Sequence, residues 1–375
     1  MRAPWWEKCV DWVWRNFAHV LFGITADDWS KLLQENQYAI EVPYWHRALS
    51  ITLHSIHNSV QRKRERHWFD AALAKTAILP PLFILGHWRN GTTHLHNLLA
   101  LDPQFAFANS YQVLFPHTFL STEAAASPLM AYGLPERRPQ DNVRMAMDAP
   151  AEDEFALNTL TGRSIYAGWI FPRREEHYDR YLTSAGIPEQ ELKVWKAAFV
   201  WFLKKLTWKY HRPLVLKSPP HTGRIRLLLE MFPDARFVHI HRNPYIVFQS
   251  SQLTRRAIAP IFNLQRPDWR HQDHRILHCY RLMYDAFFEE RKLIPADRFH
   301  ELAFEDLERD PLGQMEILYQ RLGLVGFETL RPAFELYLAS LAGYRKNTFP
   351  EPRPDLRRQI AVAWQRNFEE WRYQV

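Results

Sequence analysis

Residues 81–95 combine a strand-like apolar run with groups that bind anions. The run Leu82-Phe83-Ile84-Leu85 is typical of a buried strand, and Gly86 follows it directly. We expect a tight turn after Gly86 and a helix that opens at Gly91-Thr92-Thr93. Backbone N–H groups of such a turn and of the helix N-terminus converge on one point, and the two threonines add hydroxyl donors. The segment therefore predicts a site for a phosphate or a similar anion.

The spacing of Gly86 and Gly91 matches that of a Walker A loop, but the lysine of that motif is absent. Thr92 stands in the lysine position, and the cation comes earlier, at Arg89. Enzymes with Walker loops use the lysine on the β- and γ-phosphates of ATP, together with Mg²⁺. A loop without this lysine therefore either uses a donor other than ATP or is inactive.

Two further predicted strands also end in a cation. The run Arg236–Ile240 predicts a strand that leads to Arg242, and the helix after it reaches Ser250. The run Leu214-Val215-Leu216 places Lys217 at the end of another strand. A planar guanidinium binds phosphate through two hydrogen bonds, so Arg242 is a candidate for a second phosphate contact.

The pattern Arg89-x-Gly91-Thr92-Thr93 after a buried strand resembles the 5′-phosphosulfate loop of sulfotransferases that use 3′-phosphoadenylyl sulfate (PAPS). Tyrosylprotein sulfotransferases and many bacterial relatives have Arg at the first position, as here. In that family an Arg at a strand end and a Ser eight residues later bind the 3′-phosphate, which is the spacing of Arg242 and Ser250. Lys217 matches a catalytic lysine of tyrosylprotein sulfotransferases. The resemblance implies PAPS as co-substrate, no metal, and donor binding by Arg89, Asn90, Gly91, Thr92, Thr93, Arg242 and Ser250.

The resemblance is specific over residues 80–102 and 213–251 and looser out to residue 347. Phe304-Glu305-Asp306-Leu307 with Asp310-Pro311 is similar to the family's "YEDL…DP" segment, with Phe304 in place of Tyr. We interpret Tyr344-Arg345-Lys346-Asn347 as a basic lid over the donor. This interpretation adds Arg345 and Lys346 to the candidate donor-binding residues.

The catalytic base needs a separate argument, because an acceptor hydroxyl must lose its proton as it attacks sulfur. Tyrosylprotein sulfotransferases have a Glu at the position of Ser110, so that base is not conserved in this chain. The segment that follows Pro150 contains Glu152, Asp153 and Glu154, and resembles a "P-x-E-D-E" segment of bacterial relatives. We expect Pro150 in the first turn of a helix, from which at most one or two of the three carboxylates can face a cleft. The candidate catalytic residues are Arg89, Lys217, Glu152, Asp153 and Glu154.

The elements that position these groups alternate between strands and helices. Strand-like runs at 82–85, 214–216, 236–240 and 299–302 are separated by long helical stretches, which predicts an α/β fold with a mainly parallel sheet. The family resemblance implies a P-loop-kinase-like sheet flanked by helices. In the helix predicted over 195–210, Trp195, Phe199, Phe202 and Leu206 form an apolar face with lysines opposite.

Residues 1–75 have the pattern of helices, with aromatic residues from Trp5 to Phe17, a helix from Tyr44 to Val60 and a basic run over 61–66. We divide the chain into a helical N-terminal extension over 1–75 and a sulfotransferase domain over 76–375. The basic run is typical of a solvated helix face. Peripheral membrane contact through these N-terminal helices is a second hypothesis.

Composition limits the partners. The 375 residues carry 48 Lys and Arg against 41 Asp and Glu, a net charge of +7 that suits an anionic partner. Two cysteines, Cys9 and Cys279, exclude a disulfide scaffold and a cysteine zinc cluster, and no H-E-x-x-H spacing indicates a metal site. The chain has no uninterrupted apolar leader, so we expect a cytoplasmic protein with possible membrane association.

The acceptor is open at this point: a hydroxyl or amine, with an apolar or lipid-like alcohol suggested by the 14% aromatic content. Two alternatives to a sulfotransferase also stay open. One is a P-loop-like nucleotide kinase, against which the missing Walker lysine argues. The other is a non-enzymatic protein that binds a nucleotide or nucleic acid, although no recognition helix or RNA-binding signature supports a nucleic-acid partner. The sequence does not indicate an oligomeric state.

Overall fold

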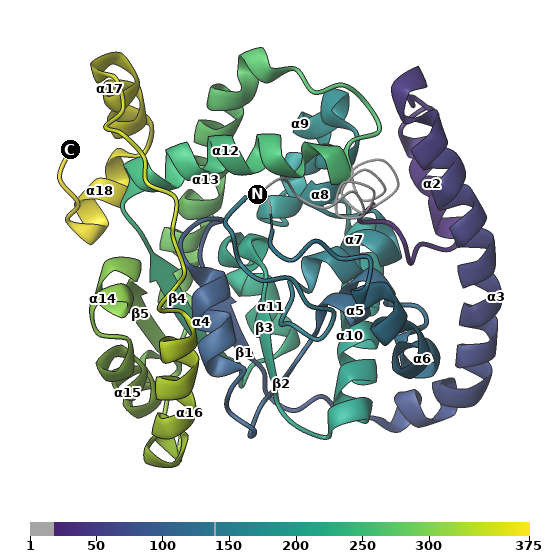
Figure 1. The fold of residues 1–375 in the computed structure, drawn as a ribbon, viewed down its shortest axis with the longest axis horizontal. Coiled ribbons are helices and arrows are strands. Elements are labelled where there is room, and N and C mark those ends of the chain that lie inside the picture. The colour runs from purple at the N-terminus through teal and green to yellow at the C-terminus, as the bar shows by residue number, and fades with distance from the viewer. Residues whose placement is uncertain (1–18, 139) are drawn as a thin grey trace, which may run out of the picture.

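The computed structural model describes residues 19–138 and 140–375 and has a parallel sheet at its centre (Figure 1). The strand order is β2-β3-β1-β4-β5, and every neighbouring pair is parallel. The strands are β1 (Leu82–Leu85), β2 (Ala106–Phe107), β3 (Leu214–Lys217), β4 (Arg236–His241) and β5 (Phe299–Ala303). Parallel strands need long crossover connections, which explains why helical segments separate them along the chain.

Both faces of the sheet are buried, as the continuous apolar run of β1 requires. Leu82 and Ile84 face one core, which α4 (Thr92–Leu99), α15 (Pro311–Arg321) and α16 (Phe327–Ser340) cover. Phe83 and Leu85 face the other core, which α10 (Glu189–Tyr210), α11 (Ile225–Met231), α13 (Gln272–Glu290), α17 (Pro354–Ala363) and α18 (Gln365–Trp371) cover. The other α-helices after residue 76 are α5 (Ser110–Leu114), α6 (Phe119–Ala131), α7 (Glu154–Thr161), α8 (Ile165–Ile170), α9 (Glu175–Tyr178), α12 (Pro244–Phe262) and α14 (Phe304–Arg309). A short 3₁₀ helix, η4 (Pro219–Gly223), follows β3.

Two N-terminal helices, α2 (Ala26–Glu35) and α3 (Trp45–Lys75), lie along one edge of the molecule (Figure 1). Trp29 and Leu32 of α2 and Ala48 and Ile51 of α3 share a core with α8 and with the end of α12. The aromatic segment from Trp5 to Phe17 lies outside the described residues. Within the described ranges, no helix combines the length and the apolar character that a membrane crossing demands.

The structure confirms the four predicted strands and corrects two local expectations. The helix that begins near Tyr44 runs through the basic stretch to Lys75, in agreement with the helical pattern of this region, and the structure adds a short strand, β2. Pro150 does not lie in a first helical turn, because α7 begins at Glu154. The lysines of α10 are expected in solvent, opposite its apolar face. Lys205 is instead fully buried and paired with Glu65 of α3 at 2.5 Å.

Candidate functional site

Three adjacent strands deliver the predicted site residues to one edge of the sheet. β1 lies between β3 and β4, and its carboxyl end continues into the loop that carries Arg89. Lys217 is the last residue of β3, and Arg242 directly follows β4. In open parallel sheets this edge is where ligands bind. The fold therefore brings together three groups that are widely separated in the sequence.

The backbone of the loop after β1 needs conformations that glycine adopts easily. Gly86 and Gly91 have φ of 145° and 92°. A Cβ on Gly86 would lie 2.6 Å from the Ile240 carbonyl oxygen, and one on Gly91 would overlap the ring of Phe304. Arg89 also has a positive φ, 76°, which is uncommon for a residue with a side chain. These positions shape a tight loop that leads into the N-terminus of α4.

Asn90 holds this loop in place. Its side-chain amide is fully buried and donates to the Ile240 carbonyl at 3.1 Å and to the Tyr284 hydroxyl at 2.7 Å. The Gly86 amide donates to the Thr222 hydroxyl of η4 at 2.7 Å. The side chain of Asn90 is thus engaged within the protein, whereas Thr92 and Thr93 occupy the first turn of α4, where backbone N–H groups have no partner inside the helix.

Arg89, Ser250 and Arg242 lie in one cluster. Arg89 Nε donates to Ser250 Oγ at 2.8 Å, and Arg242 Nη1 donates to the Arg89 carbonyl at 3.1 Å. The Arg242 guanidinium also lies 4.3 Å from the centre of the Phe304 ring. Burial and the nearby Arg89 lower the pKa of Arg242 from its usual value. The sequence spacing of Arg242 and Ser250 therefore corresponds to a real juxtaposition next to the loop.

One carboxylate, Asp141, neutralises part of this cluster. It accepts from Arg89 Nη1 at 2.8 Å and from Arg138 at 2.8 and 3.0 Å. Burial alone would raise the pKa of Asp141, but Arg138 and Arg89 hold it below its usual value. Neither Asp141 nor Arg138 was singled out from the sequence, because a surface turn of Arg and Asp residues gives no signal of its own.

The predicted basic lid lies beside this turn. Tyr344 donates to the Asp141 carbonyl at 2.9 Å, and Asn347 donates to the Gln140 carbonyl at 3.1 Å. Lys346 pairs with Glu308 at 2.7 Å, and Arg345 is exposed. The segment is thus anchored near the Arg cluster through its flanking residues, while its two cations face solvent or a neighbouring carboxylate.

The three candidate bases point in different directions. Asp153 is buried and pairs with His221 of η4 at 2.6 Å. Glu154 is buried too, and accepts from Arg224 at 2.7 and 3.0 Å and from Ser164 at 2.7 Å. Both carboxylates therefore tie the start of α7 to the body of the protein.

Glu152 has a different environment. One carboxylate oxygen accepts from Lys217 Nζ at 2.8 Å and the other from the Tyr166 hydroxyl, and 15% of its side chain stays exposed. Tyr166 in turn accepts from Trp88 Nε1, in the loop after β1, at 3.0 Å. Burial, and then the nearby Glu152, raises the pKa of Tyr166 well above its usual value, so the phenol stays protonated. The arrangement links a partly exposed carboxylate to both the loop after β1 and Lys217.

Tyr166 and Trp88 could not be identified from the sequence, because neither belongs to a recognisable motif. His241, one residue before Arg242, contacts the Tyr373 hydroxyl at 2.9 Å and stacks on Trp371. Tyr373 also donates to Glu305 of the predicted "YEDL…DP" segment, whose other oxygen accepts from the Asn243 amide. This chain of contacts supports the backbone next to Arg242.

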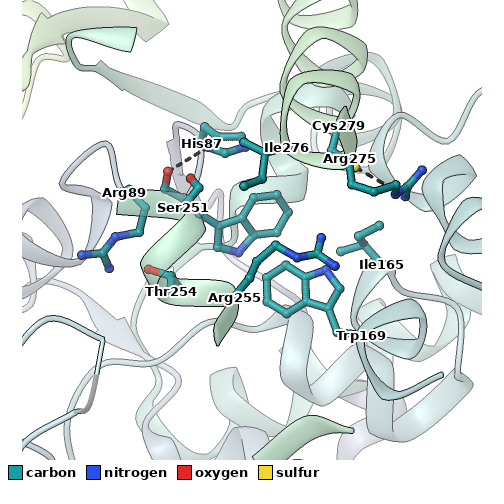
Figure 2. Close-up of a pocket in the computed structure, with 11 residues that line it drawn as sticks. His87, Arg89, Ile165, Trp169, Ser251, Thr254, Arg255, Arg275, Ile276 and Cys279 are labelled. Carbon is teal, nitrogen blue, oxygen red and sulfur yellow. Dashed lines mark hydrogen bonds between the residues drawn. The ribbon is translucent and has the colours of Figure 1, made fainter. Parts of the chain in front are cut away.

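A cavity of about 40 Å³ adjoins the loop after β1 (Figure 2). Trp88, Ile165, Trp169 and Ile276 give it apolar walls, and Arg89 lies at its edge. Cys279 also lines it, but burial raises the pKa of its thiol to about 12, so it is not a nucleophile. Among residues 19–138 and 140–375 no group of three or more His, Cys, Asp or Glu side chains is arranged to hold a metal ion.

Comparisons with known proteins agree with this geometry. A model of the sulfotransferase family matches residues 80–328. Two curated relatives from Mycobacterium bovis and Mycobacterium tuberculosis, each named omega-hydroxy-beta-dihydromenaquinone-9 sulfotransferase Stf3, are 37% identical over 338 residues, which cover 90% of this chain and 87% of the relative.

Solved structures are similar in fold. The sulfotransferase STF9 from Mycobacterium avium has a TM-score of 0.71 at 18% identity, covering 93% of this chain and 96% of its own. The sulfotransferase STF1 from Mycobacterium tuberculosis has a TM-score of 0.63 at 18% identity, covering 92% of this chain and 93% of its own. At this level of identity the likeness concerns the arrangement of the sheet and its helices.

Proposed function

The chain belongs to the sulfotransferase family, and from that premise we propose that its sulfuryl donor is PAPS and its acceptor a lipid-like alcohol. Membership in this family argues against the two alternatives that the sequence left open, a nucleotide kinase and a non-enzymatic binding protein. We also propose that residues 76–375 form the sulfotransferase domain and that residues 1–75 are a helical extension. The family match over 80–328 supports this division.

The observation that carries the donor proposal is the cluster of Arg89, Ser250 and Arg242. The loop and the N-terminus of α4 suit one phosphate group, which many nucleotides could supply. Arg242 and Ser250 add guanidinium and hydroxyl donors on the neighbouring strand end and helix. A sulfuryl donor with a second phosphate on the ribose 3′-oxygen accounts for both sets of hydrogen-bond donors, whereas AMP and ATP have no phosphate there.

In the proposed reaction the acceptor oxygen forms a bond to sulfur while the bond from sulfur to the 5′-phosphate oxygen breaks. The acceptor proton passes to Glu152, and the departing phosphate keeps the bonding electron pair. Arg89, Lys217 and the first amides of α4 stabilise the negative charge that grows on that phosphate. Lys217 is 2% exposed and already bonds Glu152, so the end of β3 carries a cation in direct contact with the proposed base.

Two features support a lipid-like acceptor. The relative Stf3 is named for a hydroxylated menaquinone derivative, and it matches 90% of this chain. The walls that Trp88 and Trp169 contribute beside the loop are apolar and aromatic, as a hydrocarbon acceptor requires. Burying such a group beside Glu152 would also exclude water from the sulfuryl group.

The decisive test compares 3′,5′-adenosine bisphosphate with AMP by calorimetry and thermal shift. Hydrogen bonds to a charged group contribute about 1.5–3 kcal/mol, so the bisphosphate should bind at least about tenfold more tightly. Arg242→Ala should remove most of this preference and Ser250→Ala a smaller part. Arg256→Ala, on the same helix as Ser250 and bonded to Gln272, is the matched control and should leave the preference intact. Equal binding of AMP and bisphosphate, or stabilisation by Mg-ATP alone, would contradict the proposed donor.

A further inference from the structure

The outward face of α3 is apolar where a surface helix is ordinarily polar. Trp45, Leu49, Leu53, Ile56 and Val60 recur every three or four residues, so they lie on one face of the helix. Their exposed fractions run from 48% to 61%. In an amphipathic helix of a globular protein the apolar stripe faces the core and the opposite face is charged or polar. We call this set of five residues the α3 stripe.

The inward face of α3 is already fully occupied. Ala48 and Ile51 are buried in the core shared with α2 and α8, and Asn58 donates to the carbonyls of Phe22 and Ile24 at 2.7 and 3.0 Å. α3 therefore cannot rotate to bury the α3 stripe without breaking these contacts. The helix lies at the rim of the molecule, with the body of the protein on one side (Figure 1). The α3 stripe is thus a fixed, outward-facing apolar surface.

The same outward face becomes basic in the next turns. Lys63, Arg64 and His67 continue the spacing of the stripe and are exposed. In the part of the chain that the structure describes, no ion pair joins Lys63 or Arg64 to a carboxylate, whereas their neighbours Arg62 and Arg66 pair with Asp28 and Asp70. One face therefore presents aromatic and aliphatic side chains first and unpaired cations second.

We infer that α3 docks on an anionic lipid surface, with the α3 stripe inserted among the acyl chains and Lys63 and Arg64 at the lipid phosphates. A helix with large apolar residues on one face and basic residues beside them is the kind that lies in the plane of a bilayer surface. Docking in this way brings the enzyme to the surface where a lipid-like acceptor resides, and in that respect it rests on the proposed function.

A second copy of the chain fits this surface less well. If two α3 helices packed in parallel, Lys63 and Arg64 of one would face the same cations of the other. If they packed antiparallel, the cations of one helix would face the apolar half around Trp45 of the other. An anionic bilayer satisfies both halves at once, because its phosphates and acyl chains are adjacent.

The test measures co-sedimentation of the full chain with phosphatidylcholine vesicles that contain none or about a third phosphatidylglycerol. We expect binding to the anionic vesicles that falls at least tenfold in Leu49→Gln/Leu53→Gln/Ile56→Gln. Lys63→Gln/Arg64→Gln should lose about fivefold per residue on anionic vesicles only, because each basic residue near such a surface interacts with its potential. The matched control is Leu336→Gln/Val362→Gln, whose side chains are 75% and 73% exposed on α16 and α17, and its binding should be unchanged.

Three results would overturn the inference. The first is equal vesicle binding by the wild type and the triple variant. The second is a wild-type dimer in light scattering that the triple variant loses, with no vesicle binding by either. The third is vesicle binding that depends on residues 1–18 but not on the α3 stripe. If the triple variant proves unstable, the Lys63 and Arg64 variant alone still decides the charge dependence.

The outcome for the donor is read separately. Binding of 3′,5′-adenosine bisphosphate is measured on the same preparations, and the α3 variants should retain it. Vesicle binding without any preference for the bisphosphate would contradict the proposed donor while supporting the docking of α3. A preference for the bisphosphate without vesicle binding would support the proposed donor and contradict the docking of α3.

Discussion

Glu152 differs from its two acidic neighbours in what its oxygens contact. Asp153 and Glu154 are held by buried His221 and Arg224, whereas Glu152 faces Lys217 and Tyr166 and remains partly exposed. Glu152→Gln should therefore reduce kcat by about 10²–10⁴, the usual loss for a general base. Bisphosphate binding should stay near that of the wild type. Asp148→Asn, an exposed change in the same segment, is the control for turnover, and full activity of Glu152→Gln would remove this residue from the proton transfer.

We expect Tyr166 to act on Glu152 as a positioning residue, because its hydroxyl donates to one carboxylate oxygen and holds the carboxylate in place. Tyr166→Phe should lower kcat by about tenfold while KM and bisphosphate affinity stay near those of the wild type, because a hydrogen bond to a charged group contributes about 1.5 kcal/mol or more. Tyr178→Phe removes another buried hydroxyl, bonded to Asn36, and should leave kcat unchanged. An unchanged kcat in Tyr166→Phe would show that the hydroxyl has a packing role alone.

At the scale of elements, the turn that contains Arg138 and Asp141 would compete with the proposed donor for Arg89. The Asp141 carboxylate occupies the Arg89 guanidinium that the proposal assigns to a phosphate. Asp141→Asn removes that charge, so the bisphosphate should bind about three- to tenfold more tightly in calorimetry. Glu136→Gln, an exposed change nearby in the same segment, should have no such effect. Weaker binding in Asp141→Asn would instead mean that this carboxylate supports the donor-bound form of the turn.

One buried ion pair joins α3 to α10. Glu65 accepts from Lys205 at 2.5 Å and also from the Ser121 amide and hydroxyl at 2.8 and 2.7 Å. Burial lowers the pKa of Lys205 to about 8 despite its partner. Removing one member leaves an uncompensated buried charge, so Glu65→Ala should reduce the free energy of unfolding by about 3–5 kcal/mol.

The double variant Glu65→Leu/Lys205→Met tests whether the pair itself is the source of that loss. Because it leaves no buried charge, it should be more stable than Glu65→Ala in urea unfolding. The control removes the exposed ion pair of Lys193 and Glu189 on α10, and should lower the free energy of unfolding by less than about 1 kcal/mol. A double variant as unstable as the single one would place the loss in packing around Ser121.

The whole molecule contains several histidines that must stay neutral. Burial lowers the pKa of His19, His87, His96 and His241 from 6.5 to about 3. Between these values the unfolded chain binds protons that the folded chain does not, so stability is full above pH 6.5 and falls as the pH drops towards 3. Each of these histidines lowers the free energy of unfolding by up to about 1.4 kcal/mol for each pH unit in this range.

Urea unfolding at pH 7, 6 and 5 measures this slope before most carboxylates titrate. His96→Gln should reduce the slope of the free energy of unfolding against pH by about the contribution of one histidine. Replacing the exposed His271 should leave this slope unchanged. A free energy of unfolding that is constant from pH 7 to pH 5 would contradict the burial of these neutral rings.

The parts of the fold that follow local rules could be predicted from the sequence. Apolar runs such as Leu82–Leu85 identify strands, and Gly86 and Gly91 identify a tight loop, because backbone geometry restricts which residues fit there. That this loop binds an anion stays a prediction. The two-residue strand β2 is too short to show a period. The expectation that Pro150 lies in the first turn of a helix is wrong, because proline is also common just before helices and α7 begins only at Glu154.

Partners across the sheet could not be predicted in the same way. That Glu152, among three adjacent carboxylates, meets Lys217 and Tyr166 depends on how α7 and α8 pack on the end of β3. The burial of Lys205 depends likewise on Glu65, far away in sequence on α3. Such pairs follow from tertiary packing, and one sequence alone contains no signal for them.

The position of β1 at the centre of the sheet has a consequence for how the protein folds. Leu82 pairs with Val215 on one side and Arg236 on the other, each more than one hundred residues away in sequence. Contacts between such distant segments close large loops and are formed slowly. The loop after β1, which takes its shape from both neighbours of β1, is therefore expected to acquire its native form late in refolding. Recovery of the proposed bisphosphate binding should then lag behind the recovery of helical circular dichroism.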